Sequence, residues 1–225
     1  MVVVRLSSDD HARVSAAIAT AEARSDGEIV AIATEQSDAY HDVGLHWAVL
    51  ATFSALAFFA AWPQCLQSIN DALSGWSAAP DLRRLLTVLL LIALATFLAA
   101  LFLRKLMPVR MALTPRATKT RRVRRRAIDL FKTGAERRTV GRTGILIYLS
   151  MAEHRAEIVA DEAITTVTTP DTWGEAMAAL LAEVKAGRPA DGIVAAVGII
   201  GEVLAAHFPK TSDDVNEIPD KLIEL

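Results

Sequence analysis

The chain has 225 residues, enough for one large domain or for one domain with an appendage. Hydrophobic residues make up 52% of it, a high share for a soluble protein, and the formal net charge at pH 7 is −2. Its single cysteine, Cys65, excludes an intramolecular disulfide and a thiolate metal cluster.

The first 43 residues contain the patterns of one helix and one buried strand. Ser7 and Asp10 have the spacing of a capping box at the start of a helix. Residues 26–37 (DGEIVAIATEQS) include a short apolar run led by Gly27, which is typical of a strand buried on both faces. A buried strand needs partners for its N–H and C=O groups, so other strands are expected further along the chain.

Two apolar segments follow, and each is long enough to cross a membrane. Residues 44–62 and 85–103 are 19 residues each and contain no Asp, Glu, Lys or Arg. About 20 apolar residues, at a rise of 1.5 Å each, cross a hydrocarbon core of ~30 Å. The alternative, two buried core helices, is disfavoured because core helices normally keep a polar stripe. We therefore predict a transmembrane hairpin over residues 44–103, with its link at residues 63–84.

The charges that flank the hairpin predict its orientation. Residues 104–142 carry 14 Lys or Arg against 2 Asp or Glu, whereas the link carries two residues of each sign. Segments rich in Lys and Arg next to a span stay on the cytoplasmic side. Two spans place both chain ends on one side, so the N- and C-termini are expected in the cytoplasm. The hairpin is expected in the inner (cytoplasmic) membrane.

The second half of the chain supplies partners for the first strand. A helix is predicted over residues 120–133, and apolar strands are predicted at 144–150 and 155–161. A capping-box spacing at Thr172 begins another predicted helix. The last predicted helix, over residues 191–208, has a charge-free stretch that is too short for a span, so a core helix is expected.

These elements predict one α/β domain with a mixed sheet, interrupted by the membrane hairpin. Strands 28–34 and 144–150 should be parallel because a helix crosses between them, and the third strand should be antiparallel by hairpin connection. The domain is expected to comprise residues 1–43 and 104–225, the latter including a basic juxtamembrane helix.

Three stretches carry a family resemblance: SDGEIVAIA, RRTVGRTGILIYLSMAEHRAEIVAD and HFPKTSDDVNEIPD. They resemble the TPM domain in its short bacterial membrane-protein branch. The family is named after a thylakoid-lumen phosphatase, a photosystem II repair protein and a modulator of acetylcholine receptors. The resemblance implies a three-layer α/β fold. It implies little about activity, since some members show weak acid phosphatase activity or bind calcium and others act through protein partners.

Carboxylates at strand ends are the candidate metal ligands. Asp26 and Glu28 lie at the start of the first strand, and Asp161 and Glu162 follow the third. Ligands tend to bind at strand ends in open α/β sheets, and carboxylates brought together there could hold Ca²⁺ or Mg²⁺. The alternative is a spread-out set of surface carboxylates. No nucleophile–base pair stands out in the sequence, so no catalytic residue is assigned and no cofactor is required.

The basic stretch after the second span is the candidate surface for contact with lipid or other anions. Its members are Arg121, Arg122, Arg124, Arg125, Arg126 and Arg142. The net charge is −5 over residues 1–43, +12 over 104–142 and −9 over 143–225, and few aromatic residues are interleaved for base stacking. A basic stretch beside a span is expected to rest on anionic headgroups, with each Lys or Arg contributing about 1 kcal/mol. This favours the lipid bilayer over nucleic acid as the partner.

The sequence thus favours a cytoplasm-facing, membrane-tethered TPM-like module that works mainly by binding or scaffolding a protein partner or a second copy of itself, with catalysis absent or marginal. The alternative is a metal-dependent phosphoester hydrolase of low activity. Clustered carboxylates in a cleft would favour the enzyme, and an apolar groove or an oligomeric patch would favour the binding module.

Overall fold

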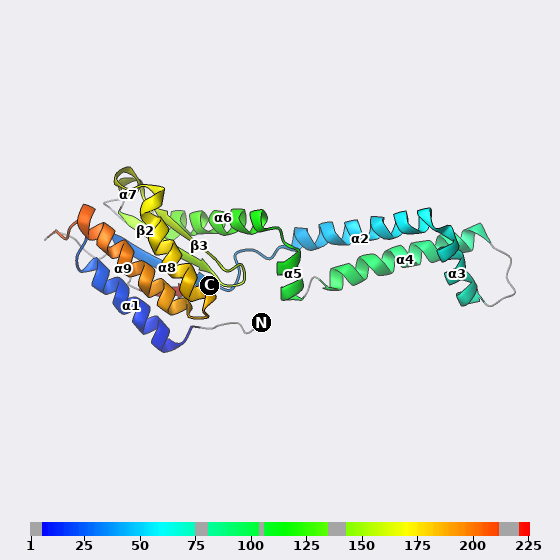
Figure 1. The fold of residues 1–225 in the computed structure, drawn as a ribbon, viewed down its shortest axis with the longest axis horizontal. Coiled ribbons are helices and arrows are strands. Elements are labelled where there is room, and N and C mark those ends of the chain that lie inside the picture. The colour runs from blue at the N-terminus through cyan, green and yellow to red at the C-terminus, as the bar shows by residue number, and fades with distance from the viewer. Residues whose placement is uncertain (1–5, 75–80, 104–105, 135–142, 212–220) are drawn as a thin grey trace. The chain divides into compact units, whose positions relative to one another are not determined.

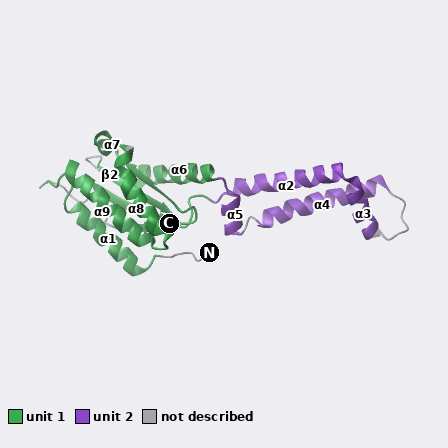
Figure 2. Cartoon of the chain, in the orientation of Figure 1, with its two compact units in different colours: residues 1–38, 116–225 green, residues 39–115 purple. Residues whose placement is uncertain are grey.

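The computed structural model describes residues 6–74, 81–103, 106–134, 143–211 and 221–225. The chain forms two compact units (Figure 2). Unit 1 comprises Met1–Asp38 and Arg116–Leu225, and unit 2 comprises Ala39–Pro115. Unit 2 is therefore an insertion between two parts of unit 1.

Unit 1 is built on a four-stranded mixed sheet in the order β3–β2–β1–β4. β2 and β3 are labelled in Figure 1. The strands are β1 (Glu28–Thr34), β2 (Gly144–Ser150), β3 (Arg155–Ala160) and β4 (Leu222–Glu224). β1 is parallel to β2 along its whole length, and β3 is antiparallel to β2. Both predicted pairings are confirmed, so the buried first strand finds its partner beyond the insertion.

β4 pairs in parallel with the other side of β1, with Ile32 opposite Ile223. β1 is consequently an interior strand, which explains why all seven of its residues are buried. The polar tail of the sequence does not predict this strand, because three residues are too few to show a strand pattern.

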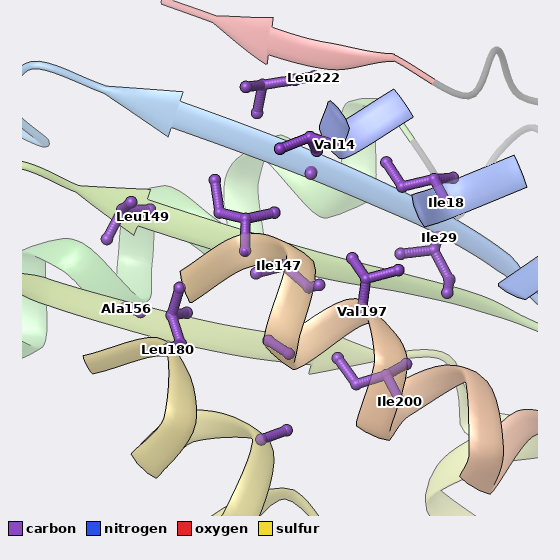
Figure 3. Packing of buried hydrophobic residues seen from close by; sticks show 14 of the residues in the cluster. Val14, Ile18, Ile29, Ile147, Leu149, Ala156, Leu180, Val197, Ile200 and Leu222 are labelled. Atoms are coloured by element: carbon purple, nitrogen blue, oxygen red, sulfur yellow. The ribbon is translucent and has the colours of Figure 1, made fainter. Parts of the chain in front are cut away.

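Among the described residues, one face of the sheet is covered mainly by α1 (Ser8–Glu22), α8 (Gly174–Lys185) and α9 (Pro189–His207). α9 contacts both α1 and α8. Its buried side chains, among them Val197 and Ile200, pack in one cluster with Ile29 and Ile147 of the sheet (Figure 3). The long apolar stretch of α9 is thus explained by packing in the core, as predicted.

In the described part of the chain, α6 (Arg116–Gly134) is the helix that covers the opposite face. Val123, Ala127 and Phe131 of α6 lie at helical spacing and are buried against alternate residues of the strands. These strand residues are Val30, Ile32, Leu146 and Tyr148. The domain therefore has the three layers that the resemblance implies.

The predicted capping boxes have different outcomes. The box at the start of α1 is present, because Ser7 Oγ accepts the N–H of Asp10 at 3.1 Å and the Asp10 carboxylate accepts the N–H of Ser7 at 2.9 Å. The box predicted at Thr172 is wrong by one turn. It forms between Thr169 and Thr172 and opens the 3₁₀ helix η1 (Pro170–Trp173), which follows the short helix α7 (Glu162–Val167) and precedes α8.

Unit 2 is helical in the residues described. It contains α2 (His41–Ala61), α3 (Pro63–Ser74), α4 (Leu82–Leu103) and α5 (Met107–Leu113). α2 and α4 contact each other and contain most of the two predicted spans; α3 lies at the end of the pair where α2 finishes, and α5 at the end where α2 begins (Figure 2). The sequence predicts only a link between the spans, whereas the structure has α3 there.

Candidate functional site

A chain of buried and half-buried polar side chains lies at the carboxyl ends of β1 and β2. Tyr148 of β2 is fully buried, and its hydroxyl lies 3.2 Å from Thr34 Oγ1 and 2.9 Å from Ser37 Oγ. Ser150, the last residue of β2, donates a hydrogen bond from Oγ to Oε2 of Glu153. The carboxyl ends of parallel strands are the edge where open α/β sheets bind ligands, so this network is the first place to look for a site.

The turn between β2 and β3 holds the segment that leaves β1. The N–H groups of Met151 and Ala152 donate to the carbonyl oxygens of Thr34 and Glu35, at 3.0 and 2.9 Å. Glu153 Oε1 accepts the N–H of Ser37 at 2.9 Å. The path of the chain from β1 toward the insertion is therefore fixed by backbone and side-chain hydrogen bonds.

An ion pair connects the segment that follows β1 to α6. Asp38 is the last residue of unit 1 before the insertion, and its Oδ1 lies 3.0 Å from Nη1 of Arg122. Arg122 is thus a positioning residue, and it lies in the first half of the helix that follows the insertion. This ion pair therefore connects the N-terminal part of unit 1 to its C-terminal part, immediately before the insertion.

The side chains of this network hold the chain in place, and they are not arranged to react with a substrate. Ser150 is fully buried and Glu153 is nearly so, which keeps a substrate away from the serine hydroxyl. None of the five side chains, Thr34, Ser37, Tyr148, Ser150 and Glu153, was predicted from the sequence. The available signal was the polar tip of Tyr148 within the otherwise apolar run GILIYL.

Two of the predicted metal ligands lie at the opposite end of the sheet. Glu28 pairs with Gly144 of β2. The antiparallel register of β3 places Asp161 on the other side of Gly144, and its N–H donates to the Gly144 carbonyl oxygen at 2.9 Å. Glu28 and Asp161 are each 5% exposed and share one row across the sheet. This is the amino end of β1 and β2, so the binding rule for carboxyl ends does not apply to it.

The other two predicted ligands have different surroundings. The Asp26 carboxylate accepts the N–H and the hydroxyl of Thr211, both at 2.8 Å. Glu162 is exposed in the first turn of α7. Within the described part of the chain, no three His, Cys, Asp or Glu side chains gather as a metal site. The row of Glu28 and Asp161 offers only part of the six to eight oxygen ligands that Ca²⁺ takes.

The predicted anion-contacting arginines lie mostly on the outer side of α6. Arg121, Arg124, Arg125 and Arg126 are exposed, whereas Arg122 is half-buried beside Asp38. Arg142 lies outside the described residues. Their spacing leaves a cationic surface along the helix, because the apolar residues of α6 occupy the side that faces the sheet.

One carboxyl group sits beside this surface. Glu157 of β3 pairs with Tyr148, which places its side chain on the α6 side of the sheet. Burial raises the pKa of the Glu157 carboxyl above its ordinary value, and the positive charges of Arg124 and Arg155 oppose that shift. This acid therefore belongs to the contact between α6 and the sheet.

Three helices among the described residues are long and apolar enough to cross a membrane: α2, α4 and α9. Half of the apolar window of α9 is buried in the core of unit 1. α4, whose 22 residues are all described, buries none of them, and α2 buries few. The apolar surface left open is therefore concentrated in unit 2.

The fold is a three-layer α/β domain with a mixed sheet whose central parallel pair is split by a helical insertion. Residues 88–203 match the TPM domain, which is more than half of the chain, so the protein belongs to the TPM domain family. The match begins within α4 and ends within α9. It therefore does not include α1 and β1, although β1 is an interior strand of the sheet.

The fold is also similar to a solved structure, the NMR structure of the BA42 protein from the psychrophilic bacterium Bizionia argentinensis. The TM-score is 0.56 at 18% sequence identity, and the likeness covers 98% of this chain and 95% of that one. At this identity the likeness concerns the fold alone. No curated protein sequence is significantly similar to the chain.

Proposed function

We propose that α2 and α4 cross the cytoplasmic membrane and that the TPM domain works on its cytoplasmic side as a binding or scaffolding module. The observation that carries this proposal is the exposure of α4. Leu90, in the middle of the helix, is 66% exposed, and large apolar side chains are exposed along its whole length. Fully burying a Leu side chain is worth about 1.5–3 kcal/mol, so a helix of this kind is stable in hydrocarbon and costly in water.

The aromatic residues of α2 support a spanning position. Trp47 lies near the start of the helix and donates its Nε1–H to the carbonyl oxygen of Leu113, at 3.0 Å. Trp62 follows the helix directly, and both indoles are exposed. The two indoles thus mark the two ends of the helix, and Trp is enriched at both membrane–water interfaces.

The charges of α6 support contact with anionic headgroups. This helix begins directly after the insertion and exposes four arginines. Lys and Arg close to a membrane surface each contribute about 1 kcal/mol of attraction to anionic lipid. The same arginines place excess positive charge beside the span. Such charge stays on the cytoplasmic side, which favours the cytoplasmic orientation of both chain ends. The domain would then bind a protein partner or a second copy of itself close to the lipid.

Membrane integration is tested by washing membranes that contain the full-length protein with alkaline carbonate. We expect the protein to stay in the pellet and to dissolve only in detergent. Recovery in the carbonate supernatant would contradict the proposal, because a peripheral protein is released by this treatment.

Orientation is tested with one thiol. Cys65 is half-buried, so the reporter is Gln64→Cys in a Cys65→Ala background, since Gln64 is exposed. A membrane-impermeant maleimide should label Gln64→Cys in intact spheroplasts. Labelling in inverted vesicles alone would reverse the proposed orientation.

A second candidate function is the metal-dependent hydrolysis of phosphoesters. The observation in its favour is the row that contains Glu28 and Asp161, two carboxylates buried on either side of a residue without a side chain. Both groups have polar or charged partners in the structure. A phosphomonoester assay on the full-length protein and on its Asp161→Asn and Asp26→Asn variants separates this candidate from the binding module.

A further inference from the structure

Helix α3 has one apolar and one polar side. Leu66, Ile69 and Leu73 lie at positions i, i+3 and i+7, and so share one side of the helix. The polar residues Gln64, Gln67, Ser68 and Asp71 occupy the rest of its circumference. This pattern normally buries its apolar side against a protein core.

The apolar side of α3 is only partly covered by unit 2. The helix contacts both α2 and α4, and its Asn70 is buried. Leu73 nevertheless remains 69% exposed and Ile69 36% exposed, while Leu66 is half-buried. The helix is thus held in place by the hairpin, with two large apolar side chains left open.

The connection to α2 limits where α3 can lie. Trp62 alone separates the two helices, and its φ of −127° and ψ of 70° break the helical path. Pro63 then begins α3 at a position that Pro favours. A span that ends at Ala61 places the next residues at the bilayer surface, so α3 starts at headgroup level.

We infer that α3 is an interfacial helix, lying along the far surface of the bilayer with Leu73 and Ile69 inserted at the boundary between headgroups and acyl chains. This inference rests on the proposed crossing of α2 and α4. Amphipathic helices with this division of residues lie in the interface plane, with the apolar side in the acyl boundary. α3 contains no Lys or Arg, so its binding depends on apolar insertion rather than on anionic lipid.

Lipid suits this surface better than a second copy of the chain. Stable protein interfaces bury about 1,200–2,000 Å² in total, far more than two side chains can supply. A bilayer needs no matching protein surface, and its boundary is already beside α3 if α2 crosses. The consequence is mechanical: α3 prevents the far end of the hairpin from sinking into the hydrocarbon.

The test places a nitroxide spin label at single cysteines of the full-length protein, in a Cys65→Ala background, reconstituted in vesicles of phosphatidylcholine and phosphatidylglycerol. Leu73→Cys reports the apolar side of α3, and Gln64→Cys is the matched control on its polar side. Leu90→Cys reports the middle of α4. Each label is scored by its collision rate with oxygen, which concentrates in lipid, relative to a water-soluble nickel chelate.

We expect Leu73→Cys to favour oxygen and Gln64→Cys to favour the nickel chelate, which is an inversion across one helix. If both labels favour nickel while Leu90→Cys favours oxygen, α3 lies in water, and the inference fails while the proposed spans stand. If the Leu73→Cys label is shielded from both reagents, protein covers it and the inference also fails. A Leu90→Cys label that favours nickel would overturn the spans themselves, and the inference with them.

Discussion

Ser37 Oγ lies 2.9 Å from the hydroxyl of Tyr148, although the two residues are 111 positions apart in the chain. The same hydroxyl lies 3.2 Å from Thr34 Oγ1 at the end of β1. One buried phenol therefore joins the last residue of β1 to the segment that leads into the insertion. Any movement of that segment must break hydrogen bonds made by β2.

Replacing this phenol should measure what its hydrogen bonds contribute to the stability of unit 1. Tyr148→Phe removes both hydrogen bonds and leaves the buried Thr34 hydroxyl without this partner, so the free energy of unfolding should fall by about 1–3 kcal/mol. Denaturant unfolding monitored by circular dichroism gives the difference. Ser37→Ala is the matched control, because it keeps the contact with Thr34 and should cost less. Equal losses in the two variants would mean that the Thr34 contact contributes nothing.

Two glycines of α9 should respond in opposite directions to the same substitution. A Cβ added at Gly201 would lie 2.7 Å from the Cβ of Ala21 in α1, whereas one added at Gly198 would meet no described atom within 4 Å. Gly198→Ala should stabilise the helix by about 0.5–1 kcal/mol, and Gly201→Ala should destabilise by about 1–3 kcal/mol through overpacking. Thermal unfolding of both variants checks the signs, and the same sign for both would contradict the close approach of α1 and α9.

The split domain should survive the loss of its insertion. Replacing residues 39–115 with a short Gly/Ser linker should leave a soluble, folded unit 1, because the cost of loop closure grows by only about 0.6 kcal/mol for each doubling of loop length. Gel filtration and circular dichroism test this directly.

Removing residues 1–38 from the same shortened protein is the matched comparison. β1 lies between β2 and β4, so its loss exposes a buried edge of β2 and should cause aggregation. A truncated form that stays monomeric and as stable as its parent would show that β1 is not an integral strand of the domain.

Stability should depend on pH through Glu157. Burial raises the pKa of this carboxyl above its ordinary value of 4.5, so the folded protein holds the proton more tightly than the unfolded chain does. The stability from this group is complete below about pH 4.5 and is lost as the pH rises through the higher folded pKa. Glu157→Gln should therefore stabilise the protein at pH 7 and lose this advantage at acidic pH.

Arg124→Gln is the companion variant for that experiment. It removes a positive charge that favours the ionised form of Glu157, so it should lower stability at pH 7 more than at acidic pH. Unfolding curves over a pH series give both differences. A Glu157→Gln effect that is independent of pH would assign the change to packing rather than to ionisation.

The sequence predicts the elements whose pattern is local and misses those that depend on distant contacts. The apolar runs of β1 and β2 and the helix between them are enough to fix a parallel pair. Leu222–Glu224 shows no pattern of its own and becomes a strand only because the side of β1 is open to it. The hydroxyls of Ser37 and Tyr148 likewise have no shared spacing, since the fold alone brings them together.

The same contrast between local patterns and distant contacts separates the helices from the two ends of the sheet. The apolar spacing of α6 identifies its buried side directly, and Val123, Ala127 and Phe131 are buried as that spacing indicates. The two ends of the sheet, by contrast, cannot be told apart before the register is known. The predicted carboxylates at Glu28 and Asp161 therefore share a row, but at the amino end of the parallel pair.

Catalysis by this row should be absent or marginal. Phosphoester hydrolysis needs a metal or arginine to stabilise the transferring group, and a positioned nucleophile or water. Glu28 and Asp161 supply two buried carboxylates, and Asp26 already binds Thr211 through both of its oxygens. We therefore expect the full-length protein in detergent to turn over a generic phosphomonoester little above background with Ca²⁺, Mg²⁺ or Mn²⁺.

The same assay on variants decides between the two proposed functions. Asp161→Asn changes the buried row, and Asp26→Asn changes a carboxylate that is already bound to Thr211. If binding is the function, both substitutions leave any residual rate within a few-fold, because that rate does not come from a built site. If the row is catalytic, the rate depends on added metal and is lost in Asp161→Asn, while Asp26→Asn retains more of it. A metal-dependent rate with that pattern would make hydrolysis the function and binding the secondary role.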